Sequence, residues 1–134
     1  MTTAIDSMVL IDLFQSEPAW VDRAAAAIDQ AIRSGRLIAC DLVWAEVASR
    51  FPSAEMLSSA MDELSVEFDP ADEAVAGSAG LLWAQFRRAG GARRDRVVAD
   101  FLIGAHALNH ADALLTRDRG FYRRYFKGLR IIEP

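Results

Sequence analysis

Short apolar segments alternate along the chain with longer amphipathic ones. The short segments have the length of β-strands and are bounded by polar or turn-forming residues. The predicted strands are residues 2–5, 37–40, 66–68, 113–116 and 130–132. The last one is expected at an edge of the sheet.

The longer segments predict helices, several of which have a capping residue at the start and a glycine or proline after the end. The predicted helices are residues 8–15, 16–34, 41–51, 53–64, 70–88, 97–109 and 121–126. Ser16, Glu17 and Pro18 are expected to begin the second helix and Gly35 to end it. Gly90 and Gly91 are expected to end the helix at 70–88.

Strands of three to five residues that alternate with helices predict βα units. The chain of 134 residues is long enough for one core, and its hydrophobic content of 52% is ample for packing. No internal repeat, low-complexity segment or linker divides it. We therefore predict a single α/β domain, residues 1–134, with a short, mostly parallel sheet flanked by helices.

Four carboxylates interrupt or directly follow apolar segments: Asp6, Glu46, Asp100 and Asp118. Asp6 and Asp118 stand at predicted strand ends, where ligands gather in parallel sheets, and Glu46 and Asp100 lie on predicted helices. An ionised carboxylate is costly to bury alone, so acids in such places are expected to share a cation. The alternative is that Glu46 and Asp100 reach solvent while the other two cap helices, and no short motif decides between these interpretations.

Clustered carboxylates repel one another unless a cation joins them. A cluster made only of carboxylates suits Mg²⁺ or Mn²⁺, hard ions that prefer oxygen ligands and accept substrate phosphate. Such an ion lowers the pKa of bound water and neutralises charge on a phosphoryl oxygen, which is the chemistry of phosphodiester hydrolysis. The hydroxyls of Ser7 and Thr116 are placed to orient a carboxylate, although a helix cap and a turn former are equally open interpretations.

The net charge of −4 hides an uneven distribution. Residues 1–86 carry 14 acidic and 4 basic side chains, whereas residues 87–134 carry 5 acidic and 11 basic ones. The basic C-terminal third can attract a polyanion locally, although solubilising surface charge explains it equally well. Arg117 and Arg119, on either side of Asp118, and Arg94 in the glycine–arginine segment are the candidates for contact with such a polyanion.

Other features limit the setting of the protein. Cys40 is the single cysteine and is predicted to be buried. No signal-peptide pattern precedes the first apolar segment, and no apolar run approaches the ~20 residues that span a bilayer, so we expect a cytoplasmic protein without membrane contact.

His106 and His110 are four residues apart, but no third zinc ligand follows at a usual spacing, which favours packed or surface histidines. Asp12 is expected to be an ordinary surface or capping acid.

Two stretches carry a resemblance to a known family. The C-terminal stretch is ADFLIGAHALNHADALLTRDRGFYRRYFKGLRIIEP, and the N-terminal one is AIDSMVLIDLF, in which an acid ends a strand and a small hydroxyl residue follows. Both resemble VapC-type toxins, the PIN-domain ribonucleases of bacterial toxin–antitoxin pairs. The resemblance covers essentially the whole chain and is weakest over residues 50–90.

The resemblance implies a small PIN-like domain that hydrolyses RNA with Mg²⁺ or Mn²⁺. RNA would then be the polyanion that Arg94, Arg117 and Arg119 contact. It implies that four acids bind the metal and act in catalysis: Asp6, Glu46, Asp100 and Asp118. The motif that matches Glu46 is the weakest of the four, since it is only a glutamate on an apolar helix. It further implies a cognate antitoxin as the partner and a homodimer within the toxin–antitoxin complex.

Rival classes fit the sequence less well. A receiver domain phosphorylated on aspartate needs a lysine near the end of a later strand, and Lys127 lies too far beyond the last candidate acid. A phosphatase that uses an aspartate nucleophile needs a second acid at the position of Met8. No phosphate-binding P-loop sequence occurs. The alternative that stays open is a non-catalytic PIN-like module that binds RNA or a protein.

Overall fold

The computed structural model describes residues 1–91 and 96–134, and this part of the chain forms one five-stranded sheet. The strands are β1 (Thr2–Ile5), β2 (Arg36–Ala39), β3 (Val66–Phe68), β4 (Ala113–Leu115) and β5 (Arg130–Ile132). Each neighbouring pair is parallel, in the order β3-β2-β1-β4-β5. The predicted α/β class is confirmed, and β5 lies at an edge as expected.

The strand order places β1 and β4 side by side, although their registered partners Ala4 and Leu114 are 110 positions apart in the chain. The chain moves from β1 outward through β2 to β3, and then returns to the other side of β1. The carboxyl ends of β1 and β4 therefore form the point where the strand order reverses, which is where open α/β sheets bind ligands.

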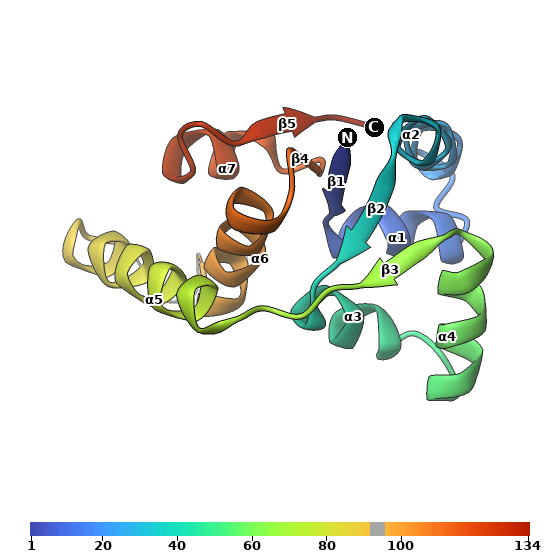
Figure 1. The fold of residues 1–134 in the computed structure, drawn as a ribbon, viewed down its shortest axis with the longest axis horizontal. Coiled ribbons are helices and arrows are strands. Elements are labelled where there is room, and N and C mark those ends of the chain that lie inside the picture. The colour runs from blue at the N-terminus through green and yellow to red at the C-terminus, as the bar shows by residue number, and fades with distance from the viewer. Residues whose placement is uncertain (92–95) are drawn as a thin grey trace.

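Helices lie on both sides of the sheet (Figure 1). They are α1 (Ser7–Phe14), α2 (Val21–Ser34), α3 (Asp41–Ala48), α4 (Ala54–Glu63), α5 (Glu73–Arg88), α6 (Val98–His110) and α7 (Arg119–Tyr125). In Figure 1, α5, α6 and α7 lie to the left of β1 and β2, and α2 lies to their right. Helix α3 begins just beyond the carboxyl end of β2.

Two helices, α2 and α5, begin three or more residues after the predicted start. Ser16, Glu17 and Pro18 do not begin a helix: Ser16 has a φ of 51°, and the Glu17 N–H donates to the Asp12 carbonyl, so this segment ends α1. Helix α2 begins at Val21 instead. Helix α5 begins at Glu73 rather than at residue 70, because the Asp72 carboxylate accepts a hydrogen bond from the Val75 N–H and caps the helix.

The core between the sheet and α6 is aromatic. Phe101 on α6 packs against Phe121 and Phe126 with ring centroids 5.2 and 6.2 Å apart. Position 104, one turn after Phe101 on α6, requires glycine, because a Cβ there would lie 2.4 Å from the Phe126 ring. This packing fixes α6, and with it Asp100, beside the end of β4.

Among the described residues, no helix is long and apolar enough to cross a membrane.

Candidate active site at the carboxyl end of the sheet

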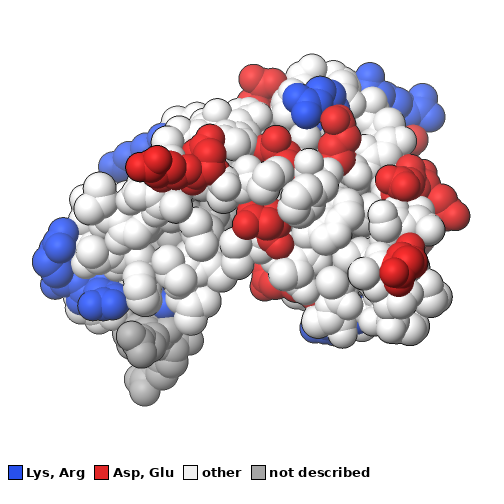
Figure 2. Space-filling model, turned by 60° about the horizontal axis from the view of Figure 1, so that its bottom comes forward, with Lys and Arg blue, Asp and Glu red and all other residues white. Residues whose placement is uncertain are grey.

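The four acids singled out by sequence line one cavity of about 360 Å³. Asp6 follows β1, Glu46 lies on α3, Asp100 is in the first turn of α6 and Asp118 follows β4. The structure thus brings the four acids to one cavity, and their role in catalysis and metal binding stays a prediction. The face that Figure 2 presents is hollowed at its lower middle, with acidic side chains across its middle and right and basic ones at its left end and upper edge.

Thr116 joins two of the acids. Its Oγ1 donates a hydrogen bond to Asp6 Oδ2 at 2.7 Å and accepts one from the Asp118 backbone N–H at 3.0 Å. The other oxygen of Asp6 accepts a hydrogen bond from the Ser7 N–H at 2.8 Å, which caps α1. Asp6, Ser7 and Thr116 are all buried, so the Asp6 carboxylate is held in one orientation. Both hydroxyl residues predicted to support the site thus lie beside Asp6.

The cavity is unfavourable for negative charge. Burial is the largest influence that raises the pKa of Asp6 above its ordinary value, and the charges of Asp118 and Asp100 act in the same direction. The hydrogen bonds from Thr116 and Ser7 oppose this rise without cancelling it. The pKa of Glu46 is also raised, first by partial burial and then by the charge of Asp6, while contact with Ser7 lowers it.

Arginines partly balance these acids. Arg96 Nη1 lies 2.7 Å from Asp118 Oδ2, and its guanidinium stacks over the Phe121 ring at 4.2 Å. Arg117 also lines the cavity and pairs with Asp12, with its Nε 3.2 Å from Oδ2. The prediction for Asp12 was wrong, because this carboxylate is only 2% exposed and needs Arg117 as its partner.

The three candidate RNA-binding arginines have different environments. Arg117 is held by Asp12 and stacks over the Trp20 ring at 4.6 Å. Arg119 is exposed and pairs with Glu133 at 2.9 Å. Arg94 lies outside the described residues. Contact with RNA stays a prediction for all three.

The donor set of the cavity fits a hard divalent cation. Four carboxylates supply oxygen ligands only. The pKa values of Asp6 and Glu46 are raised first by burial and then by neighbouring carboxylates, and a cation beside them would lower both. Among the residues that the structure describes, the group of acids and histidines whose ligand atoms all lie within 4.8 Å of one another is elsewhere, at Asp69, His106 and His110. No three carboxylates of the cavity come this close together in the described part of the chain.

Several side chains that line the cavity were not predicted from the sequence, among them Tyr122 and Arg50. Tyr122 is buried, and burial followed by the charge of Asp6 raises the pKa of its hydroxyl well above the ordinary value, so it stays protonated. Arg50 lies at the rim and donates to Gln15 Oε1 at 3.1 Å. Each follows a predicted site acid by four positions, Tyr122 after Asp118 and Arg50 after Glu46, and this helical spacing was the available signal.

The comparisons with known proteins agree with the resemblance found in the sequence. The family model of the PIN domain matches residues 3–127, so the chain belongs to the PIN-domain family, as predicted. No curated protein matches the chain significantly.

Several solved structures share the fold over nearly the whole length. A chain of VapBC2 from Rickettsia felis, bound to a DNA fragment from its promoter, is 18% identical with a TM-score of 0.75, covering 99% of this chain and 98% of that one. A chain of VapBC-1 from nontypeable Haemophilus influenzae is 19% identical with a TM-score of 0.71 and the same coverage. A chain of DNA-bound VapBC from Salmonella typhimurium is 17% identical with a TM-score of 0.72, again at 99% and 98%. At these identities the likeness is one of fold.

Proposed function

We propose that this protein is the toxin of a bacterial toxin–antitoxin pair and acts as an endoribonuclease that depends on Mg²⁺ or Mn²⁺. The observation that carries the proposal is that four acids from four separate elements of a PIN domain line one cavity. The proposal also draws on the solved VapBC complexes that share the fold.

In this proposal Asp6, Glu46, Asp100 and Asp118 hold the cation. When bound, such an ion activates water and neutralises charge on the phosphoryl oxygen. Thr116 and Ser7 keep Asp6 in one orientation, so little reorganisation is needed when the substrate binds. Tyr122 stays protonated, which lets its hydroxyl donate a hydrogen bond without adding charge to the cavity.

Arginines at the rim suit an RNA substrate. Arg96 pairs with Asp118 in the free protein, and a phosphate group of RNA can take the place of that carboxylate once a cation holds Asp118. Arg117 presents a fixed guanidinium on the same cavity. The substrate is therefore proposed to be held by its backbone, with the RNA sequence selected elsewhere.

The proposed partner is a cognate antitoxin, and the toxin is proposed to form a homodimer within the complex. A basic side chain of the antitoxin that enters the acidic cavity would replace the cation and inhibit the enzyme. Expression of the chain alone should then arrest growth, and the neighbouring small gene should relieve it. Lack of affinity between the two purified products would end the toxin–antitoxin assignment even if RNA cleavage survived.

RNA cleavage by the purified chain, with Mg²⁺ or with excess EDTA, tests the enzymatic part. Cleavage should stop on chelation and in the variant Asp6→Asn. The matched control is Asp62→Asn, which changes an exposed acid on α4 outside the cavity. Undiminished cleavage in EDTA would reject the metal-dependent mechanism, and sequencing the RNA ends after induced expression identifies the target.

A second candidate function is a non-catalytic PIN-like module that binds RNA or a protein. The Arg96–Asp118 ion pair favours it, because one of the four acids already has a cationic partner. Titration of the chain with Mg²⁺ distinguishes the two. An inert module has no need to bind the cation, whereas the proposed nuclease binds it and loses this binding in Asp6→Asn.

A further inference from the structure

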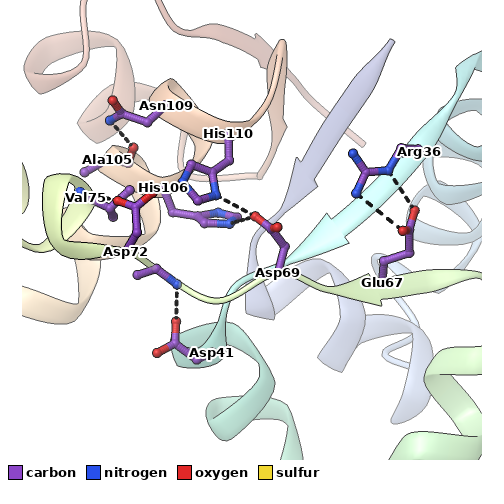
Figure 3. Close-up of polar contacts among 11 residues, drawn as sticks. Arg36, Asp41, Glu67, Asp69, Asp72, Val75, Ala105, His106, Asn109 and His110 are labelled. Atoms are coloured by element: carbon purple, nitrogen blue, oxygen red, sulfur yellow. Dashed lines mark hydrogen bonds and ion pairs between the residues drawn. The ribbon is translucent and has the colours of Figure 1, made fainter.

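A second group of potential ligands lies away from the acidic cavity, between the segment after β3 and helix α6. Asp69 follows β3, and its backbone N–H donates to the Ala39 carbonyl. His106 and His110 project from one face of α6 toward it (Figure 3). None of these three residues lines the acidic cavity.

The two imidazoles converge on a single oxygen atom. His106 Nε2 and His110 Nδ1 each lie 2.7 Å from Asp69 Oδ2. The three ligand atoms lie within 4.8 Å of one another. In a tetrahedral zinc site, bonds of about 2.0–2.1 Å separate neighbouring ligand atoms by roughly 3.3 Å. Each of the two nitrogen–oxygen separations of 2.7 Å therefore needs to widen by about 0.6 Å to admit an ion.

Asp72 completes the arrangement on the outer side of His110. Its Oδ2 lies 2.8 Å from His110 Nε2, the ring nitrogen that points away from Asp69. Its Oδ1 accepts a hydrogen bond from the Val75 N–H, so the carboxylate is held in place as the cap of α5. A metal-bound histidine usually donates its other N–H to a carboxylate in this way, which fixes the tautomer that the metal requires.

The burial of the group suits a structural ion. The His106 side chain is 1% exposed, and those of His110 and Asp69 are 21% and 30% exposed. Because His110 and Asp69 are partly exposed, solvent water can supply a fourth ligand. Two imidazole nitrogens with one carboxylate oxygen suit Zn²⁺, whereas Mg²⁺ prefers oxygen ligands alone.

We infer that Asp69, His106 and His110 form a zinc site, separate from the acidic cavity and independent of the proposed nuclease function, with Asp72 orienting His110. The ion joins the segment that leads into α5 to helix α6. Because α6 also carries Asp100, the site fixes the helix that supplies one acid of the cavity. The rival explanation is a hydrogen-bonded cluster in which His110 is an imidazolium, since a metal-free ring can donate to both Asp69 and Asp72 only with both nitrogens protonated.

The composition of the chain makes a zinc titration unusually specific. The sequence holds two histidines, and both belong to this group. The single cysteine, Cys40, is buried, and burial raises its pKa to about 11, so it is a poor thiolate ligand at neutral pH. An untagged chain should be titrated with Zn²⁺ in excess Mg²⁺, which occupies carboxylate sites without competing for imidazole.

The expected result is one Zn²⁺ per chain. The melting temperature should rise by roughly 8 °C at a zinc concentration about one hundred times Kd. Zinc binding and the rise in melting temperature should both be lost in His110→Ala and in Asp69→Asn. Both should persist in Asp100→Asn, the matched change in the acidic cavity. Asp72→Asn keeps a good helix cap but turns an amide N–H₂ toward His110, so it should weaken zinc binding about tenfold to a hundredfold.

A measurement on the unaltered protein avoids any dependence on how the variants fold. Long-range ¹H–¹⁵N NMR spectra of the two imidazoles should show, with zinc, a proton on Nδ1 of His106 and on Nε2 of His110, the opposite tautomers. Either of two results would overturn the inference in favour of the hydrogen-bonded cluster. The first is zinc binding that survives in His110→Ala, and the second is an unaltered chain that binds no zinc and whose imidazole spectra do not change on zinc addition.

Discussion

Thr116 Oγ1 and Asp6 Oδ2 lie 2.7 Å apart, although 110 residues separate them in the chain. The contact exists because β1 and β4 are adjacent and parallel, and each residue directly follows its strand. The hydroxyl is satisfied on both sides, since it also accepts a hydrogen bond from the Asp118 N–H. One buried hydroxyl therefore sets the positions of two of the four candidate catalytic acids.

Replacing Thr116 by valine keeps the shape of the side chain and removes both hydrogen bonds. We expect a loss of about 1–2 kcal/mol in the free energy of unfolding, because the Asp118 N–H and the Asp6 carboxylate lose a buried partner. Mg²⁺ affinity should fall about tenfold, the size typical of changes that support a metal ligand. Urea denaturation and Mg²⁺ titration measure the two effects. Thr116→Ser retains the hydroxyl and should lose much less affinity.

Asp100→Asn tests charge repulsion inside the cavity. The Asp100 side chain partly faces solvent. Its Oδ2 accepts a hydrogen bond from the Val97 N–H at 3.1 Å, and the amide oxygen of Asn can accept the same bond. Without metal, the variant should be more stable by up to about 1 kcal/mol, because the carboxylates of Asp6 and Glu46 lose a repulsive neighbour. RNA cleavage should fall about a hundredfold.

The same variant should respond less to Mg²⁺. Binding to the folded state alone raises the melting temperature of the parent, and the loss of one ligand should reduce that rise. A variant that cleaves RNA normally and keeps the parent's Mg²⁺-dependent rise would remove Asp100 from the proposed site.

The raised pKa of Glu46 predicts a dependence of stability on pH that Glu46→Gln should abolish. Below the ordinary value of 4.5, the carboxyl is protonated in both the folded and the unfolded chain, so the metal-free parent and the variant should differ little. As the pH rises from there through the raised pKa, the unfolded chain ionises first, and the parent loses stability relative to the variant.

Denaturation of both metal-free proteins at about pH 4 and about pH 7 measures this difference. The variant should gain over the parent only at the higher pH. An equal gain at both values would show that the effect comes from packing rather than from charge. Asp62→Asn, an exposed acid on α4, serves as the control and should show no such dependence.

Arg117 and Arg119 should separate structural from RNA-binding effects. Arg117→Met leaves the buried Asp12 carboxylate without its partner and should cost about 2 kcal/mol of stability. Arg119→Met breaks only an exposed ion pair with Glu133 and should cost less than about 0.5 kcal/mol. If Arg119 contacts RNA, its variant should bind RNA more weakly at unchanged stability, and unchanged affinity would end that assignment.

Local sequence patterns were enough to predict most of the helices and strands and to single out the four acids. Strand Thr2–Ile5 and helix α6 follow from local apolar patterns, and an acid in such a pattern, as at Asp6 or Asp100, is conspicuous because burying it is costly. The same local patterns failed at Ser16, where a left-handed backbone conformation and a hydrogen bond back to Asp12 end the first helix.

Which of these residues meet could not be predicted from local patterns, because it depends on how the elements pack. The order of the strands brings Thr116 to Asp6, the fold buries Asp12 against Arg117, and the segment after β3 supplies Asp69 to His106. Periodicity describes which face of one element is apolar, but it carries no information on which elements become neighbours. Contacts between residues far apart in the chain depend on the packing of the whole domain, and for that reason the histidines had no visible third ligand until the fold was known.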